Sequence, residues 1–347
     1  MAVRHPADEF FFLFGGAPNS SLQFPPNVTK LEAGIFAGYR LFRKYWYDYK
    51  LPSTLKKIRA DIFVATDGIC SMRTQLPQCL IVQDLAFLHG PGLMPTSVAG
   101  FLKKHTASSV NKAKQVVTAS QYSREELVRK YGVPQQKLNL VNFAASPIFH
   151  PGDWEEKQNI KENYSGGKEY FLSIGPVHPR KNLRNLLKAF SIFKKWQKSN
   201  MQLLITGGVA WDQEAFVQSI ETYKYREDLK LLGYVPAMEY ARIIASANAL
   251  IYPSYYGILG LPMLEAMQSG VPVVSSRRAG FAETAGGAAL FVDPENVQDI
   301  ADKMMTVYKD EQLRNDLIVK GLERARDFDW DQAADRMWDI IQQTAKP

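Results

Sequence analysis

Cysteine is scarce in this sequence. Cys70 and Cys79 are the only two in 347 residues. Two thiols cannot build the disulfide framework of a small secreted domain, and they lack the companions of a structural zinc site. We therefore expect a reducing, cytoplasmic setting and no bound metal.

Long apolar runs are also absent. No stretch approaches the roughly 20 apolar residues that a membrane-spanning helix requires. The run from Phe10 to Phe14 is too short for a signal peptide, and it follows the acidic pair Asp8 and Glu9. We expect a chain that is neither secreted nor membrane-spanning. Internal repeats and low-complexity segments are missing as well.

The composition is that of a globular protein. Its 46% hydrophobic and 12% aromatic residues can bury a large core, and the length is most simply two domains. Lys and Arg outnumber Asp and Glu by 42 to 35, a net charge of +7. This charge favours an anionic partner, either phosphate, acidic lipid or nucleic acid. The basic residues are scattered and no nucleic-acid recognition motif accompanies them, so we expect no nucleic acid.

One stretch predicts a ligand-binding corner. Residues 250–276 read as a strand stopped by Pro253, a loop containing Gly257 and Gly260, a helix from Pro262, and a second strand. Free N–H groups at the helix start could hold a phosphate, and Glu265 could bind a sugar hydroxyl. The alternative is that Glu265 only complements the helix dipole and that the glycines are turn residues.

A second turn has the same design. Strand Tyr170 to Ile174 is followed by the sequence GPVHPRKN, which begins with Gly175. This sequence precedes a helix with regularly spaced apolar residues. Arg180 and Lys181 stand near that helix start, where two cations and free N–H groups make a strong anion site. The alternative is two ordinary exposed basic residues.

A third candidate lies in the first half of the chain. Strand Cys79 to Val82 runs into QDLAFLHGP, which places Gln83, Asp84 and His89 after a strand end. His89 could equally be an ordinary loop histidine. Farther on, Ser123 with Glu126 three residues later predicts the capped start of a helix.

These stretches resemble family 4 of the glycosyltransferases, the retaining family with the GT-B fold. The corner is similar to the donor-site signature SxYEGFGLPxLEAMxxGxPVxxS. The matching residues are Ser254, Tyr256, Gly260, Leu261, Pro262, Leu264, Glu265, Ala266, Met267, Gly270, Pro272, Val273 and Ser276. QDLAFLHGP resembles HDLxFxHxP, GPVHPRKN resembles GxxxxRKN, and the segment around Glu283 resembles a loop near the donor.

The sequence departs from the family pattern in three places. The family's first glutamate falls on Gly257, its next two residues are Ile258 and Leu259, and its leading histidine is Gln83. A glutamine can hydrogen-bond a hydroxyl but cannot titrate, so a role that moves a proton is lost there. We also expect the family's first βα unit to be missing from this chain.

The resemblance implies an α/β fold with two Rossmann-like domains facing a cleft. Residues 1–150 would form the acceptor-side domain and residues 151–327 the donor-binding domain, with 328–347 packing back on the first. The reaction would move a sugar, mannosyl or glucosyl, from a GDP- or UDP-linked donor to a glycan or lipid-linked acceptor, with retention. Such chemistry serves polysaccharide or glycolipid assembly. We expect no metal and no cofactor beyond the nucleotide-sugar co-substrate.

The implied residue roles follow the motifs. Arg180 and Lys181 would stabilise the diphosphate, Glu265 would bind the ribose, and the backbone of the donor loop would hold phosphate or sugar. The donor-site set is Gly175, Arg180, Lys181, Gly257, Leu259, Gly260, Leu261 and Glu265, and the catalytic set is Gln83, Asp84 and His89. Because of the departures we expect reduced activity. The alternatives are a non-catalytic nucleotide-sugar-binding protein and a nucleotide-sugar epimerase of the same fold.

An aromatic and basic segment suggests a further partner. Residues 31–49 read as a helix with Leu41, Phe42, Tyr45 and Trp46 on one face and Arg40, Arg43 and Lys44 close by. Such a face is either core with a solvated rim or a peripheral contact with the anionic inner face of a membrane.

Overall fold

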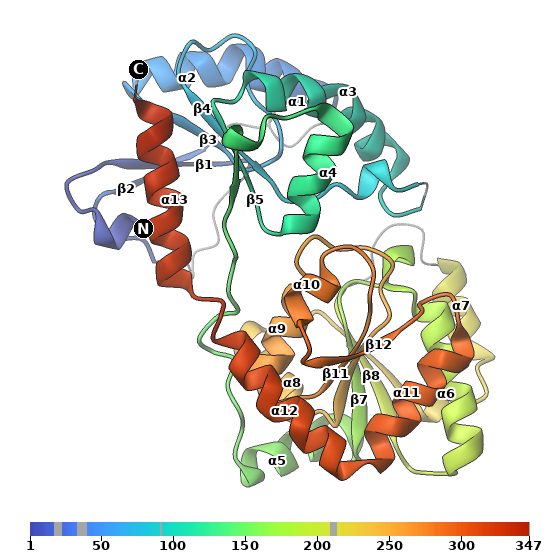
Figure 1. Cartoon of the computed structure of the whole chain (residues 1–347). Coiled ribbons are helices and arrows are strands. Elements are labelled where there is room, and N and C mark those ends of the chain that lie inside the picture. The colour runs from blue at the N-terminus through green and yellow to red at the C-terminus, as the bar shows by residue number, and fades with distance from the viewer. Residues whose placement is uncertain (17–22, 33–39, 91, 209–213, 347) are drawn as a thin grey trace.

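The computed structural model describes residues 1–16, 23–32, 40–90, 92–208 and 214–346. The chain forms two α/β halves, one above the other, each with a parallel sheet and flanking helices (Figure 1). We call residues 1–140 the N-terminal half and residues 154–325 the C-terminal half. The described residues contain no helix that is both long and apolar enough to cross a bilayer.

The C-terminal half is built on a six-stranded sheet of order β12-β11-β10-β7-β8-β9, in which every pairing is parallel. The strands are β7 (Tyr170–Ile174), β8 (Gln202–Thr206), β9 (Leu229–Gly233), β10 (Ala249–Tyr252), β11 (Val273–Ser276) and β12 (Ala289–Val292). The chain runs outward in one direction from β7 and in the other from β10. The order therefore reverses between β7 and β10, and ligands of open parallel sheets bind at the carboxyl ends of such a pair.

Helices cover both faces of this sheet because successive strand residues point to opposite sides. Phe171 packs with α6 and α11, and Leu172 packs with α8 and α9. The helices are α5 (Trp154–Ser165), α6 (Leu183–Gln197), α7 (Glu214–Glu221), α8 (Ala237–Ala245), α9 (Leu261–Gln268), α10 (Phe281–Ala285), α11 (Val297–Lys309) and α12 (Glu311–Ala325).

The N-terminal half holds a four-stranded parallel sheet and a separate parallel pair. The sheet contains β3 (Phe63–Ala65), β4 (Gln78–Val82), β5 (Gln115–Thr118) and β6 (Leu138–Leu140), and the pair contains β1 (Phe10–Phe14) and β2 (Val28–Glu32). The helices are α1 (Arg40–Tyr45), α2 (Leu51–Lys57), α3 (Thr96–Lys112) and α4 (Gln121–Tyr131). The apolar run Phe10 to Phe14 suggests a buried strand, but its residues are half-buried or exposed, since among the described strands it pairs only with β2.

The helix expected over residues 31–49 is wrong at its start. Leu31 belongs to β2, where it pairs with Leu13, and residues 33–39 lie outside the described residues. From Arg40 the chain is helical, with a π turn at Trp46–Lys50 before α2. The expected single apolar face is also wrong, because Trp46 is buried whereas Phe42 and Tyr45 are 47% and 49% exposed.

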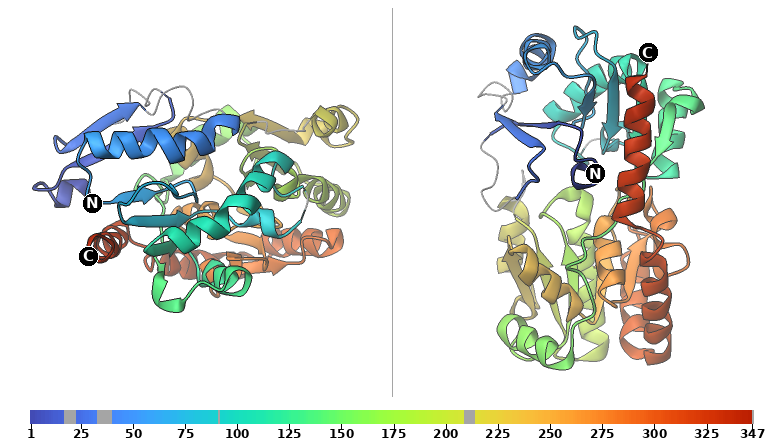
Figure 2. Two further views of the ribbon diagram at one scale, coloured as in Figure 1. Left: turned by 90° about the horizontal axis from the view of Figure 1, so that it is seen from above. Right: turned by 90° about the vertical axis from the view of Figure 1, so that its left-hand side faces the viewer.

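The last helix, α13 (Trp330–Ala345), returns to the N-terminal half (Figures 1 and 2). Its Ala333 and Ile340 pack against Cys79 and Val117 of the N-terminal sheet. At the chain start, Arg4 forms ion pairs with Asp331 and Asp335, and the His5 ring stacks on Trp338 at 3.9 Å. The two halves are therefore joined both by residues 141–153 and by this crossing helix.

Candidate functional site

The turn after β7 directs the Lys181 side chain back over the carboxyl end of the sheet. Gly175 has φ +117°, and a Cβ there would lie 2.4 Å from Cε of Lys181. The Lys181 ammonium continues toward β10 and donates a 2.7 Å hydrogen bond to the hydroxyl of Tyr252. Only glycine allows this path, so Gly175 and Lys181 act together at the β7–β10 reversal.

A side-chain amide and a backbone N–H join this turn to the turn after β10. Asn182, buried and in the left-handed conformation, donates to the carbonyls of Pro253 and Pro294 at 3.1 and 2.6 Å. The N–H of Tyr255 donates to the carbonyl of Arg180 at 2.9 Å. The two motifs that the sequence separates by about 75 residues are thus one structural unit.

The Arg180 side chain bonds the opposite half of the molecule. Its Nη1 donates to Oδ2 of Asp84 at 2.7 Å, and both side chains are about 70% covered. The backbone N–H of Arg180 donates to Nδ1 of His178. Burial and the charges of Arg180 and Lys181 lower the pKa of His178 to about 4, so this imidazole is neutral and accepts.

Glu265 lies in α9 beside Lys181. Burial raises the pKa of its carboxyl, while the hydrogen bond from Tyr240 and the charge of Lys181 lower it. The hydroxyl of Tyr240 donates to Oε2 at 2.7 Å. Tyr240 and His178 are partners that sequence reasoning missed, because Tyr240 lies outside the recognised motifs and His178 occupies a position that GxxxxRKN leaves unspecified.

The loop from Gly257 to Leu261, which the sequence predicts to bind the donor and which we call the donor loop, is packed on both sides. A Cβ on Gly257 would lie 2.5 Å from the Phe281 ring, and one on Gly280 would lie 1.7 Å from the carbonyl oxygen of Ile258. Ile258 and the preceding Tyr256 are buried in the core of the N-terminal half. The position that carries a glutamate in the related motif therefore has no room for a side chain here.

The remaining loop residues divide between packing and exposure. Leu259 packs partly buried between the two cores, and its carbonyl accepts a short hydrogen bond from Thr284. Gly260 has φ +78° and directly precedes α9, and Leu261, the first residue of that helix, is 37% exposed. This loop therefore leads directly into α9, the helix whose Glu265 lies beside Lys181.

The N-terminal half contributes the strand end after β4. Gln83 donates to the carbonyl of Thr66 at 3.1 Å, and Asp84 accepts from the N–H of Ala86 at 2.8 Å. Gln83 and Asp84 line a cavity of about 180 Å³ together with Thr66, Asp67, Gly68, Val82, Phe87, Leu102 and Thr106. Asp84 links this cavity to the turn after β7, because it forms an ion pair with Arg180.

The expected cap at Ser123 is wrong. The helix α4 begins at Gln121, and Ser120 is its N-cap, accepting from the N–H of Ser123. The Ser123 hydroxyl instead joins a buried network with Thr118 and Ser120. Glu126 therefore does not complete a capping box, and its carboxylate lies 2.8 Å from Nε2 of His89.

Glu283 bridges the two halves at the start of α4. Its carboxylate accepts 2.7 and 3.0 Å hydrogen bonds from the N–H groups of Gln121 and Tyr122. Arg324 of α12 holds the backbone of α10 through the carbonyls of Glu283 and Thr284. The expected loop near the donor is thus a helical turn that docks on the other half.

Residues 155–324 match the family model of glycosyl transferases group 1. The domain that these residues form belongs to the group 1 glycosyltransferases. The resemblance stated from the sequence is confirmed, because the matched range contains both turns of the β7–β10 reversal.

Two curated relatives come from Escherichia coli. O-antigen chain mannosyltransferase B is 30% identical over 249 residues, which are 72% of this chain and 65% of that protein. The serotype-specific mannosyltransferase WbdA is 25% identical over 227 residues, 64% of this chain and 28% of WbdA. The chain thus spans less than two thirds of each of these glycosyltransferases.

The predicted GT-B fold is also confirmed. The structure of WaaG, a glycosyltransferase involved in lipopolysaccharide biosynthesis, superposes with a TM-score of 0.80 at 14% identity, covering 98% of this chain and 93% of WaaG. At this identity the likeness concerns the fold alone.

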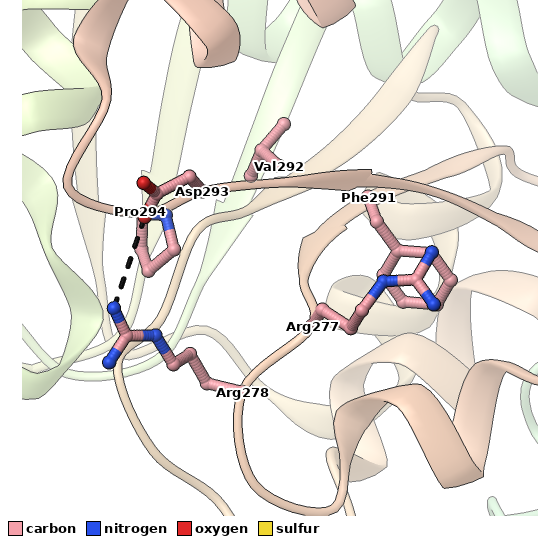
Figure 3. A pocket seen from close by; sticks show the side chains of 6 residues that line it. All are labelled: Arg277, Arg278, Phe291, Val292, Asp293 and Pro294. Atoms are coloured by element: carbon pink, nitrogen blue, oxygen red, sulfur yellow. Dashed lines mark ion pairs between the residues drawn. The ribbon is translucent and has the colours of Figure 1, made fainter.

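A larger cavity in the glycosyltransferase domain lies elsewhere. It measures about 500 Å³ at the ends of β11 and β12 and is lined by Arg277, Arg278, Phe291, Val292, Asp293 and Pro294 (Figure 3). Arg277 rests on the Phe291 ring at 4.2 Å, and Arg278 pairs with Glu295 at 3.1 Å. None of the residues predicted for the donor site lines it. No group of three or more potential metal ligands occurs in the described ranges.

Proposed function

We propose that this chain transfers a mannosyl residue from a nucleotide-diphosphate sugar to an acceptor hydroxyl, with retention, in the assembly of a polysaccharide. The observation that carries the proposal is that Lys181 lies beside Glu265 at the β7–β10 reversal, with Arg180 directly before Lys181 in the chain. The mannosyl choice is supported by the names of the two Escherichia coli relatives. Retention is supported by the resemblance of the donor motif.

In this proposal Arg180 and Lys181 bind the diphosphate as it departs. Two cations beside a helix start stabilise developing phosphate charge without a metal ion. Glu265 accepts from the ribose, and the backbone N–H groups of Gly257 to Leu261 hold phosphate or sugar. Asp84 competes with the diphosphate for Arg180, so nucleotide binding has to loosen their 2.7 Å pair.

The N-terminal half would supply the acceptor side, with residues 1–150 and 151–327 as the proposed domain limits. Gln83, Asp84 and His89 would contact the transferred sugar or the acceptor. Gly257 carries no carboxylate to contact the donor sugar, so turnover is expected below that of a family member with a glutamate there.

A transfer assay tests the proposal. With GDP-mannose, a mannose oligosaccharide acceptor and excess chelator, we expect a longer product whose new linkage keeps the anomeric configuration of the donor. Mass spectrometry detects the addition and NMR assigns the linkage. UDP-glucose is the matched second donor, and preference for it would change the sugar but not the reaction class.

The same assay separates the rival functions. A non-catalytic binding protein would bind nucleotide in calorimetry and form no product with either donor. An epimerase would convert the nucleotide sugar in the absence of acceptor. Either result would overturn the proposed transfer.

We further propose peripheral contact with an anionic membrane through the segment around α1 and α2. Phe42, Tyr45 and Tyr49 are each about half exposed, and the exposed basic residues beside them are Lys50, Lys56, Lys57 and Arg59. Arg43 and Lys44 add little, since they pair with Asp67 and Asp48. The remaining charges attract an anionic surface by about 1 kcal/mol each, and salt screens this.

Liposome flotation tests the contact. We expect salt-sensitive recovery with anionic vesicles that falls in a Lys56→Gln, Lys57→Gln variant. A Lys103→Gln, Lys104→Gln variant removes the same charge from exposed positions of α3 and should float like the unchanged protein. Equal recovery with neutral vesicles would contradict the electrostatic contact.

A further inference from the structure

The most unusual side chain of the N-terminal half is Glu126. Its carboxylate, on the inner face of α4, is only 4% exposed, although glutamate is almost never buried without a partner. One oxygen, Oε1, contacts the guanidinium of Arg129 one turn later. The other, Oε2, lies 2.8 Å from Nε2 of His89.

This second contact fixes where the imidazole carries its proton. Two lone pairs at 2.8 Å would repel, so the carboxylate favours the tautomer with the proton on Nε2. Oε2 has no well-aligned hydrogen bond in the described part of the chain, and a buried carboxylate oxygen is costly to leave without a donor. The imidazole N–H is the group placed to meet that need.

The other ring nitrogen then becomes an acceptor. The hydroxyl of Tyr122 lies 3.3 Å from Nε2, on the same side of the ring. No hydrogen bond to Nδ1 is found among the described residues. A neutral His89 with its proton on Nε2 therefore offers the lone pair of Nδ1 to a ligand, and 24% of the side chain is open to solvent.

His89 lies where both halves of the molecule meet. Its ring centroid is 4.8 Å from that of Tyr256, which directly precedes the Gly257 to Leu261 loop of the C-terminal half. The charge of Asp84, the partner of Arg180, also acts on His89. The imidazole is thus beside both the donor loop and the ion pair that joins the halves.

Burial, together with the positive charges near the ring, favours the neutral imidazole. Burial lowers the pKa of His89, Arg129 and Lys130 lower it further, and Asp84 raises it. Arg129 also compensates the charge of Glu126, which would otherwise favour the imidazolium form. The groups that face His89 come from three places. They are Tyr122, Glu126, Arg129 and Lys130 of α4, Asp84 after β4, and Tyr256 before the donor loop.

We propose that Glu126 is a positioning residue that holds His89 in the tautomer with the proton on Nε2, so that Nδ1 accepts a hydrogen bond from a sugar hydroxyl. The role in transfer rests on the proposed function. The tautomer does not, because it is argued from the contact between Glu126 and His89 and not from transfer activity.

Histidine NMR tests the tautomer without any activity. In protein labelled with ¹⁵N at its five histidines, the signals missing from a His89→Gln variant identify His89. We expect the Nε2–H form in the unchanged protein. A proton on Nδ1 would overturn the proposal.

Two variants that should move the titration midpoint of His89 in opposite directions test how the charges of Glu126 and Arg129 act on the ring. Glu126→Gln removes the negative charge and leaves Arg129 beside the ring, so the titration midpoint of His89 should fall. Arg129→Gln removes a positive charge and leaves Glu126 uncompensated, so the midpoint should rise. Arg129 is 64% exposed, so this second variant should fold even if the first does not. Glu125→Gln, on the same helix, is the matched control and should leave the midpoint unchanged.

Activity gives the last readout. Nδ1 accepts only when His89 is neutral, so the acidic limb of the pH profile should move to lower pH in Glu126→Gln and to higher pH in Arg129→Gln. We expect kcat of Glu126→Gln to fall about tenfold, with the donor KM nearly unchanged. A uniform loss of activity with unmoved limbs would show a merely structural role. If the unchanged protein transfers no sugar, the proposed function fails, while the NMR result still decides the tautomer.

Discussion

A variant carrying both Arg180→Ala and Lys181→Ala should lose most of its affinity for a nucleoside diphosphate. Hydrogen bonds to charged groups contribute about 1.5 to 3 kcal/mol each, so removing two should weaken binding a hundredfold or more. Calorimetric titration with GDP and UDP in excess chelator measures the change. The loss should be similar with and without Mg²⁺, because the two side chains take the electrostatic part of a metal ion.

The control for this experiment lies one turn farther along. Arg184 and Lys188 are exposed residues of α6, the helix that follows this turn, and changing both to alanine removes the same net charge. That variant should bind nearly as well as the unchanged protein. If both double variants lost affinity equally, general charge would explain the binding and the assignment of Arg180 and Lys181 would be wrong.

Placing the family's carboxylate at position 257 should damage the protein and not improve it. In Gly257→Glu the new Cβ would lie 2.5 Å from the Phe281 ring, which is fully buried. Overpacking of this kind costs about 1 to 3 kcal/mol, and we expect lower stability with no gain in transfer. Denaturant unfolding and the transfer assay measure the two effects.

A double-mutant cycle shows whether Phe281 is the cause. Phe281→Ala alone should cost about 3 to 5 kcal/mol because it leaves a cavity. The glutamate can use part of that cavity, so the two changes together should cost less than their sum. Additive costs would place the clash elsewhere. Gly287→Glu is the matched control, since Gly287 is exposed with open space around its Cα, and it should be nearly neutral.

The sequence was most informative where local chemistry and topology agree. A strand, a glycine and a helix start around Arg180, and again around Glu265, predicted two turns of one parallel sheet. Because parallel strands end at the same edge, the two motifs had to come close together. The structure joins them through Asn182 and Tyr255.

Elements whose form depends on distant partners were not predictable. Nothing local shows that Phe281 fills the space beside Gly257, because the contact spans 24 positions and arises only in the packed fold. The predicted cap, Ser123, is instead bonded within the buried network with Thr118, and the cap is Ser120, three residues earlier. Leu31 failed as a helix residue because β1 pairs with it.

The contact of Glu283 with the start of α4, which adds to the Ser120 cap, has a consequence for how the protein can be divided. A capping side chain usually stands within a turn of the helix it completes, but Glu283 stands 162 positions after Gln121. The first N–H groups of α4 are therefore satisfied only when the C-terminal half is in place. A fragment that ends at residue 150 would leave these donors to water and would also lack α13 over Cys79 and Val117. In the whole chain, the C-terminal residues thus complete both the start of α4 and one face of the N-terminal sheet.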